Sequence, residues 1–385
     1  MMKGIIHSIK NHMPISLSGK VSVVIILLWI LMAIFSPFIA NNKPILAKTS
    51  EAWSMPIFSD IEFNENNKYQ VKINPLIAYK FNDLEVEKSL MPPFTSGKNG
   101  IHLLGTDMLG RDIAAGMIHG ARVAFVIASS AIVLSFIFGI FVGLVIGFYG
   151  DQGIKKNLFQ QLYIILLLIF LLYYLIFLFK DSFSIYSMLP IFIIGGSALF
   201  VDKILGKIPV KKFGLPLDLF VQRLFEIKDS IPGIFIILAF IAIVAQPSIF
   251  TIPLILAFLY WMTFARYARA EAIQIREEEY IQSAKASGMG DFRILIHHIL
   301  PNALPTLLVA VAFMFSGAIL LESTLSFLGI GLPVEEVSWG KILAEARKYP
   351  KSWWLAIFPG LAIFLVLYSF NTLGDILANY QRNQN

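Results

Sequence analysis

Residues 266–305 read RYARAEAIQIREEEYIQSAKASGMGDFRILIHHILPNALP, a charged segment between two apolar runs. The pattern predicts a helix over 277–287 that carries Ile281, Ala284 and Gly288 on one small-residue face. Gly288 is expected to end this helix, because glycine favours the backbone conformation that follows a helix C-terminus.

Two further signals follow in the same segment. Asp291 is expected to cap a second short helix, and Pro301 stands where the next apolar run begins, a position that suits the start of a helix. A short helix with a small face and charged flanks suits docking into a groove of another protein. On composition alone, a plain surface turn fits this segment equally well.

The rest of the chain is typical of a membrane protein. Of its 385 residues 57% are hydrophobic and only 15% are charged, and the mean hydropathy is +0.72; a soluble domain has about 25% charged residues. Runs of about 20 apolar residues cross a bilayer as helices. The candidate spans are 21–40, 122–149, 158–179, 185–201, 231–246, 248–265, 302–321 and 354–377.

The charge distribution predicts the orientation of these spans. Lys3, Lys10 and Lys20 precede the first run, which is too long for a cleaved signal peptide and is interpreted as an uncleaved anchor. With the N-terminus inside, Lys and Arg gather in the inside loops, as the positive-inside rule requires, and both termini are cytoplasmic. The predicted segments are a cytoplasmic N-terminus with the first span (1–40), an external loop (41–121), a transmembrane domain (122–377) that includes a two-span hairpin (151–217) and a cytoplasmic loop (266–301), and a cytoplasmic tail (378–385).

The run at 122–149 contains Gly139, Gly143 and Gly147 at four-residue spacing. Such a stripe lets two helix backbones approach closely, so we expect it to pack against another helix, and it is also compatible with lining a translocation path. In the external loop, the alternation around Val71 and Ile73 predicts a short strand.

Chemistry-bearing motifs are absent from the sequence. No GxxxxGK[ST] phosphate-binding loop occurs, no catalytic constellation stands out, and the six histidines show no metal-ligand spacing. Arg122, Glu322 and Asp375 lie at span ends, where the charges are expected to snorkel to the surface. We therefore expect a protein that is not an enzyme, with no cofactor, no metal and no nucleic-acid partner, in which ion-coupled transport is disfavoured.

The segment Tyr280-Ile281-Gln282-Ser283-Ala284-Lys285-Ala286-Ser287-Gly288, followed by His298-Ile299-Leu300-Pro301-Asn302, resembles the EAA loop of ABC importer permeases of the dipeptide/oligopeptide branch. In that family the loop is the coupling helix that receives motion from the ATPase subunit. The resemblance assigns this role to Tyr280, Gln282, Ser283, Ala284, Gly288, Leu300 and Pro301. The chain departs from the family in two places, where Gln282 replaces the usual Glu and Ser283 replaces the first Ala.

Further blocks resemble the same family in order, across about 101–150 and 218–380. They are HLLGTDMLGRD (102–112), in which Asp107 is expected to cap a short helix, GAR (120–122), QRLFEI (222–227), LSFLGIG (325–331), SWG (338–340), WW (353–354), FPG (358–360) and NTLGD (371–375). The family core has six spans, so the hairpin at 151–217 is an addition. The long external loop is similar to a branch linked to microcin or larger-peptide uptake.

The resemblance implies an all-α polytopic helical bundle, with a six-span type I importer core and the inserted two-span hairpin, in a bacterial inner membrane. Its implied partners are a second homologous permease, two ABC ATPase subunits and an external substrate-binding protein, and its mechanism is alternating access. Cargo other than peptide, such as a nickel chelate, an opine, a sugar or a microcin-like peptide, stays open, and substrate-binding residues are unassigned. The alternatives from other classes are an energy-independent channel or secondary carrier, and a membrane assembly or sensor protein that transports nothing.

Overall fold

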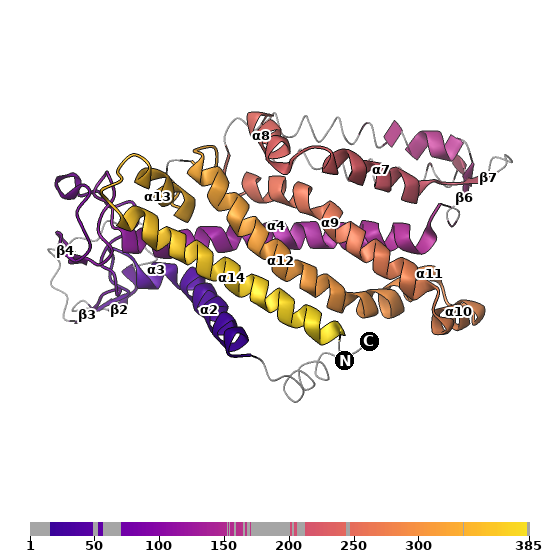
Figure 1. Ribbon diagram of the computed structural model, residues 1–385, viewed down its shortest axis with the longest axis horizontal. Helices are drawn as coiled ribbons and strands as arrows, with labels where there is room; N and C mark the ends of the chain where they lie inside the picture. The colour runs from indigo at the N-terminus through magenta and orange to yellow at the C-terminus, as the bar shows by residue number, and fades with distance from the viewer. Residues whose placement is uncertain are drawn as a thin grey trace. The chain divides into compact units, whose positions relative to one another are not determined.

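The computed structural model describes residues 16–48, 53–56, 71–151, 153, 155–157, 159–164, 166–167, 170, 201, 204–205, 212–243, 247–333 and 335–382 (Figure 1). The chain forms two compact units. Unit 1 consists of Met1–Val133, Pro247–Leu256 and Leu308–Asn385, and unit 2 of Leu134–Gln246 and Ala257–Leu307. Each unit is described by itself.

Long apolar helices dominate the described residues and make the chain a polytopic helical membrane protein (Figure 1). Five are long enough to cross a bilayer: α2 (Leu17–Ile34), α4 (Ile113–Tyr149), α9 (Thr251–Arg276), Asp291–Phe327, which ends in α12 (Leu300–Phe327), and α14 (Trp354–Arg382). The predicted run at 231–246 gives α8 (Gly233–Ile243), only 11 residues long. Most of the predicted runs at 158–179 and 185–201 lies outside the described residues.

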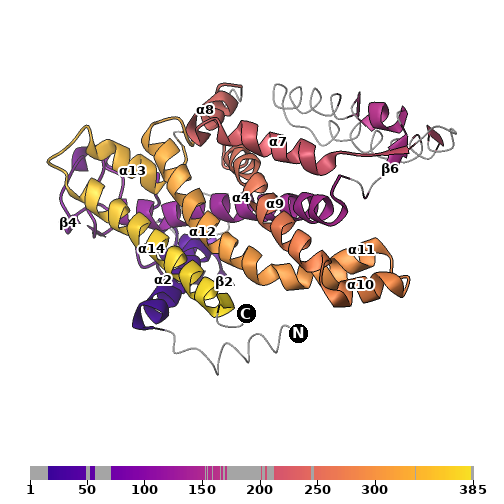
Figure 2. The same ribbon diagram turned by 45° about the vertical axis from the view of Figure 1, so that its right-hand side comes forward.

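In unit 1, α2 packs along α14, and α13 (Trp339–Ala346) packs against the same helix (Figures 1 and 2). The Trp29 side chain of α2 is 2% exposed. Its ring meets the rings of Phe125, Phe315 and Phe370 edge-on at centroid distances of 5.5–6.2 Å. Edge-to-face contacts of this kind add about 0.5–1.5 kcal/mol each beyond burial, so Trp29 fixes α2 to the bundle.

Short strands accompany the helices of unit 1. β1 (Leu46–Lys48) lies between β2 (Trp53–Ser54) and β3 (Val71–Ile73) in an antiparallel sheet, with Leu46 opposite Ile73. β4 (Thr95–Ser96) pairs with β5 (Ile101–His102), and η2 (Val86–Lys88) and α3 (Ser36–Ile39) are single turns. The strand predicted around Val71 and Ile73 is confirmed. The all-α class therefore holds only as a mostly helical architecture.

In unit 2 the glycine stripe of α4 lies directly against α9. A Cβ at Gly143 would press on the Ala265 carbonyl and come within 2.7 Å of the Ala268 Cβ, and one at Gly147 would come within 2.7 Å of the Ala272 Cβ. Gly139 meets α9 one turn earlier. The two backbones touch because no side chain separates them, which is how helices associate where the hydrophobic effect is weak.

The remaining elements of unit 2 extend this pair. α7 (Leu217–Asp229) buries Val221 and Phe225 in a cluster with residues of α4 and α9. β6 (Lys155–Asn157) pairs antiparallel with β7 (Lys212–Gly214). α10 (Glu279–Ala286), α11 (Asp291–Ile294) and a π-helical turn (Leu295–Ile299) connect α9 to α12.

Gly143→Ala is expected to lower the free energy of unfolding by about 1–3 kcal/mol, since the new methyl group overpacks the α4–α9 contact. The control is Gly360→Ala in α14, where no atom lies within 4 Å of the added Cβ; it should be neutral, or stabilising by up to about 1 kcal/mol. Thermal unfolding of the purified protein in detergent measures both. Equal shifts for the two variants would contradict the close contact.

Candidate functional site

The predicted helix at 277–287 is present as α10, shorter by two residues at its start and one at its end. Ser287 is its C-cap, and Gly288 follows with a φ of +79°, a conformation that side-chain-bearing residues rarely adopt. The Gly288 N–H donates to the Lys285 carbonyl at 3.0 Å and the Met289 N–H to the Ala284 carbonyl at 3.1 Å. Gly288 is thus required by the turn that ends the helix.

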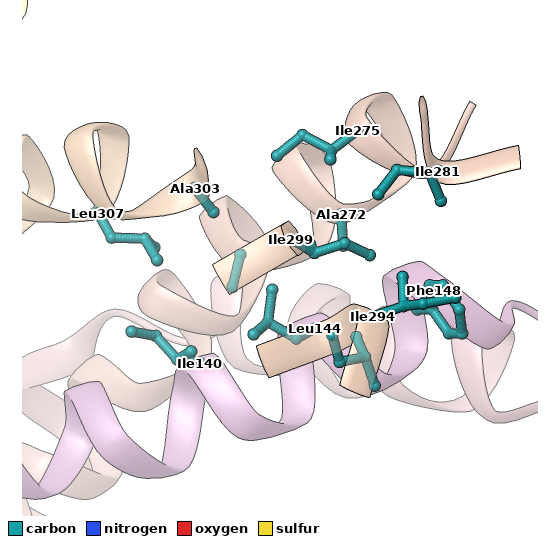
Figure 3. Packing of buried hydrophobic residues seen from close by; sticks show 12 residues of the cluster. Ile140, Leu144, Phe148, Ala272, Ile275, Ile281, Ile294, Ile299, Ala303 and Leu307 are labelled. Carbon is teal, nitrogen blue, oxygen red and sulfur yellow. The ribbon is translucent and has the colours of Figure 1, made fainter. Parts of the chain in front are cut away.

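One face of α10 is anchored in an apolar core. Ile281 is 0% exposed and packs in a cluster built from the ends of α4 and α9, α11 and the start of α12 (Figure 3). Ala284 and Leu300 pack against the same cluster from its edge. This core holds α10 in a fixed position in unit 2.

The opposite face of α10 is open to solvent. Gln282, Ser283 and Gly288 are exposed, as is Tyr280, whose hydroxyl accepts a hydrogen bond from Asn302 Nδ2 at 3.0 Å. Pro301 is half-buried beside Asn302. The residues of the predicted coupling loop therefore divide into an anchored set and an exposed set, and both come from one short stretch.

Two local predictions in this loop are wrong. Gly290, not Asp291, is the N-cap of α11, with no side-chain cap; Asp291 lies in the first turn. The helix that leads into α12 begins at Asp291 and not at Pro301, since α11 continues through the π-helical turn Leu295–Ile299. Proline lacks an N–H and crowds the preceding turn of a helix, and a widened turn accommodates it without ending the helix.

A polar cluster in unit 1 includes residues whose roles were predicted wrongly. Asp107 does not cap a helix: its Oδ1 accepts the N–H groups of Leu109 and Arg111 at 2.8 Å each, which closes a turn. The cap of α4 is Asp112, whose Oδ1 accepts the Ala115 N–H at 2.7 Å while its Oδ2 bonds His102 Nδ1 at 2.8 Å. The available signal was the position of Asp112, an N-cap residue type directly before the long apolar run that becomes α4.

Glu322 was expected to snorkel, and this is also wrong. Its side chain is 1% exposed, and its two oxygens accept from Ser326 Oγ at 2.9 Å and Ser323 Oγ at 3.3 Å. The hydroxyl groups of the same helix replace the water that a surface position would have supplied.

The turn at Asp107 and helix α13 border a cavity of about 340 Å³ in unit 1. Arg111 joins its two sides, pairing with Asp107 through Nε at 2.5 Å and with Glu345 through Nη2 at 3.2 Å. The Lys341 ammonium donates to the carbonyl oxygens of Pro333 and Glu336. Burial, and then the Arg111 charge, lower the pKa of Lys341 to about 8.

Comparison of the sequence with known proteins identifies the family of this chain. Residues 204–383 match the model of the binding-protein-dependent transport system inner membrane component. The chain is 30% identical over 280 residues, 72% of its own length and 71% of the relative's, to the dipeptide transport system permease protein DppC of Alkalihalophilus pseudofirmus. The chain belongs to this family. It is a permease subunit of an ABC importer, a non-catalytic component of the inner membrane that works within a larger transport complex.

Other relatives of this permease align over more of its length. A putative peptide transport system permease protein of Brucella suis is 27% identical over 359 residues, 93% of this chain and 85% of the relative. The inner membrane ABC transporter permease protein YejE of Escherichia coli is 25% identical over 374 residues, 90% of this chain and 89% of the relative. Membership of a binding-protein-dependent family excludes the alternatives of a channel, a secondary carrier and a protein that transports nothing.

Lys341 predicts a pH dependence of stability. Its folded pKa of about 8 lies below the ordinary lysine value of 10.5. Between these two values the unfolded state binds more protons, so stability rises with pH, and the burial penalty is fully present below about pH 8. The unfolding temperature of the permease is expected to rise from pH 7.5 to 9.5, and Lys341→Met should flatten this rise. The exposed Lys348→Met is the matched control; a wild-type slope retained in Lys341→Met would count against the assignment.

Proposed function

We propose that this permease imports peptides. The proposal is supported by the names of its relatives. Proteins that are 27–30% identical over most of the chain are named dipeptide or peptide transport permeases. A nickel chelate, an opine, a sugar or a microcin-like peptide are the alternative cargoes, since one transport core serves many substrates.

We further propose that α10 receives the ATPase. A coupling element has to be rigid on one side and accessible on the other, and α10 combines the buried Ile281 with the exposed Gln282 and Ser283. The small side chains of Ser283 and Ala286 leave room for a groove of the partner to close around the helix. The proposed complex contains a second homologous permease, two ABC ATPase subunits and an external substrate-binding protein, and works by alternating access.

For the topology we propose the six-span core with an inserted hairpin at 151–217 and both termini in the cytoplasm. The β6–β7 ladder supports the insertion, because Asn157 lies opposite Lys212 and the chain therefore leaves and returns at one place. A segment inserted between paired strands crosses the bilayer an even number of times or not at all. The segments 1–40, 41–121, 122–377 and 378–385 then keep their predicted sides.

Ser283→Trp is expected to reduce the ATPase that copurifies with the permease at least tenfold, because the indole blocks the exposed face while Ile281 keeps α10 anchored. The complex is purified in detergent from cells that express the full operon. Ser230→Trp, a matched change at the exposed end of α7, should leave copurification unchanged. Full retention of the ATPase by Ser283→Trp would refute docking on this face.

The cargo is tested by uptake in cells that lack this chain. Radiolabelled di-, tri- and penta-alanine serve as probes, and at least one is expected to enter complemented cells about tenfold faster than deleted cells. Radiolabelled nickel with a chelator and a labelled opine are measured in parallel. Unchanged peptide uptake with loss of either of the other two would replace the peptide assignment.

A further inference from the structure

The C-terminal end of α4 is capped by a side chain from another helix. The last four carbonyl groups of a helix have no partner within it. Here the Gly150 N–H takes the Ile146 carbonyl and the Gly153 N–H takes the Tyr149 carbonyl, both at 2.9 Å. The two carbonyls between them, of Gly147 and Phe148, accept from Arg276 Nη1 at 2.8 and 3.5 Å.

Arg276 suits this position electrostatically as well. The carbonyl end of a helix carries a partial negative charge, which a cation within the last turn stabilises. Arg276 is the last residue of α9, and its Nε donates to Glu277 at 2.9 Å. The guanidinium therefore ties the ends of α9 and α4 together while its main chain leads directly towards α10.

The backbone of Arg276 makes the second half of the connection. Its carbonyl oxygen accepts a hydrogen bond from Gln282 Nε2 at 2.9 Å. A carboxylate has no proton to donate at neutral pH, so a Glu at this position would face the carbonyl with like charge. The departure from the family's usual Glu thus has a structural consequence, since the Gln282 amide is a link within this chain.

A third contact runs directly from α10 to α4. The Lys285 ammonium lies 4.6 Å from the centroid of the Phe148 ring, within cation–π range. Phe148 also shares the apolar cluster with Ile281. Polar and apolar contacts therefore both join α10 to the last turn of α4, and Arg276 is bonded to each helix.

We propose that Arg276 is a positioning residue that makes α10 and the C-terminal end of α4 move as one body when the ATPase closes. This inference rests on the proposed docking of the ATPase to α10. A displacement of α10 is passed to Arg276 by the hydrogen bond from Gln282 to the Arg276 carbonyl. It is passed on to α4 by the hydrogen bond from the guanidinium to the Gly147 carbonyl. Without the Arg276 guanidinium, α10 would still bind the ATPase and keep its hydrogen bond to the carbonyl of residue 276. Only the apolar cluster and the Lys285–Phe148 contact would then join α10 to α4, and it would shift against α4 under load.

A purely structural cap makes a different prediction. A cap stabilises its helix equally with and without nucleotide, so its loss would alter stability alone. Transmission is visible only as a difference between nucleotide states, and this difference is what the experiment measures.

The chain contains no cysteine, so two cysteines introduced into it are its only labelling sites, and the permease is labelled before the partner subunits are added. We would place them at Phe141 on α4 and at Glu278, the N-cap of α10, both exposed and neither among the small residues proposed to dock the ATPase, and keep only preparations in which the ATPase copurifies. Pulsed electron–electron double resonance then gives the distance between the two spin labels, once in the nucleotide-free complex and once in the complex trapped with ATP and vanadate. The variants are Arg276→Met, which removes the donors, and Arg276→Lys, which keeps a cation. The control is Arg266→Met, also on α9, which removes an exposed ion pair with Asp229 of α7.

In the wild type and in Arg266→Met, the distance is expected to be the same in both states. In Arg276→Met it should shift on trapping by about 1–2 Å, a typical amplitude of helix displacement, and Arg276→Lys should restore most of the wild-type behaviour. A wild-type distance that changes on trapping, or an Arg276→Met distance that does not, would overturn the proposal. Absence of any ATPase from the wild-type preparation would instead overturn the proposed function beneath it.

Discussion

The close contact of α4 and α9 along three glycines is the constraint on which the loop region depends. Lipid tails are as apolar as leucine side chains, so moving a side chain from lipid to a helix interface yields little free energy. Helix association in the bilayer therefore relies on close van der Waals packing. With Gly139, Gly143 and Gly147 facing α9, the two backbones approach until further side chains would collide. Only at this separation does the Arg276 guanidinium reach the Gly147 carbonyl at 2.8 Å.

The position of α10 follows from that contact. The ends of α4 and α9 form one wall of an apolar pocket, and Ile281 fills it together with Ile294 and Ile299 (Figure 3). A buried isoleucine is worth roughly 1.5–3 kcal/mol relative to an exposed one, more than a helix of eight residues gains from its own hydrogen bonds. α10 is therefore held by its neighbours, which leaves its outer residues free to be small and polar.

Sequence patterns predicted the features that depend on periodicity. The four-residue glycine spacing indicated a packing face, and the helix α10, the strand at Val71–Ile73 and the mostly helical architecture were visible in the same way. The errors lie where a local signal competes with tertiary contacts. Asp291 carries the residue type of an N-cap, but Gly290 takes the extended conformation that precedes α11, and the π-helical turn lets Pro301 continue a helix. Glu322 was expected to reach the membrane surface, and only the fold shows its serine partners.

The capping role of Arg276 also depends on tertiary contacts and could not be predicted from the sequence. Its partners, Gly147 and Gln282, are 129 residues before it and 6 after it, and neither distance produces a periodic pattern. The resemblance marked Gln282 only as a departure from the family pattern, whereas the structure shows that its amide donates to the Arg276 carbonyl at 2.9 Å. An ionised carboxylate only accepts hydrogen bonds, so a Glu at position 282 could not make this contact.

The contacts at the β6–β7 ladder show how the chain between α4 and α7 is joined to the rest of unit 2. β6 and β7 pair where the chain departs and returns, and Asp151 accepts the Leu219 N–H at 3.0 Å immediately after them. One residue earlier, Asp218 pairs with Arg269 of α9 at 2.5 and 2.8 Å, and the guanidinium holds the pKa of this carboxyl below its usual range. The start of α7 is therefore fixed to α9 through Asp218, while Val221 and Phe225 pack against Ile146 of α4. Because the ladder closes the loop locally, residues between β6 and β7 can be added or altered without displacing the glycine contact or the anchor of α10.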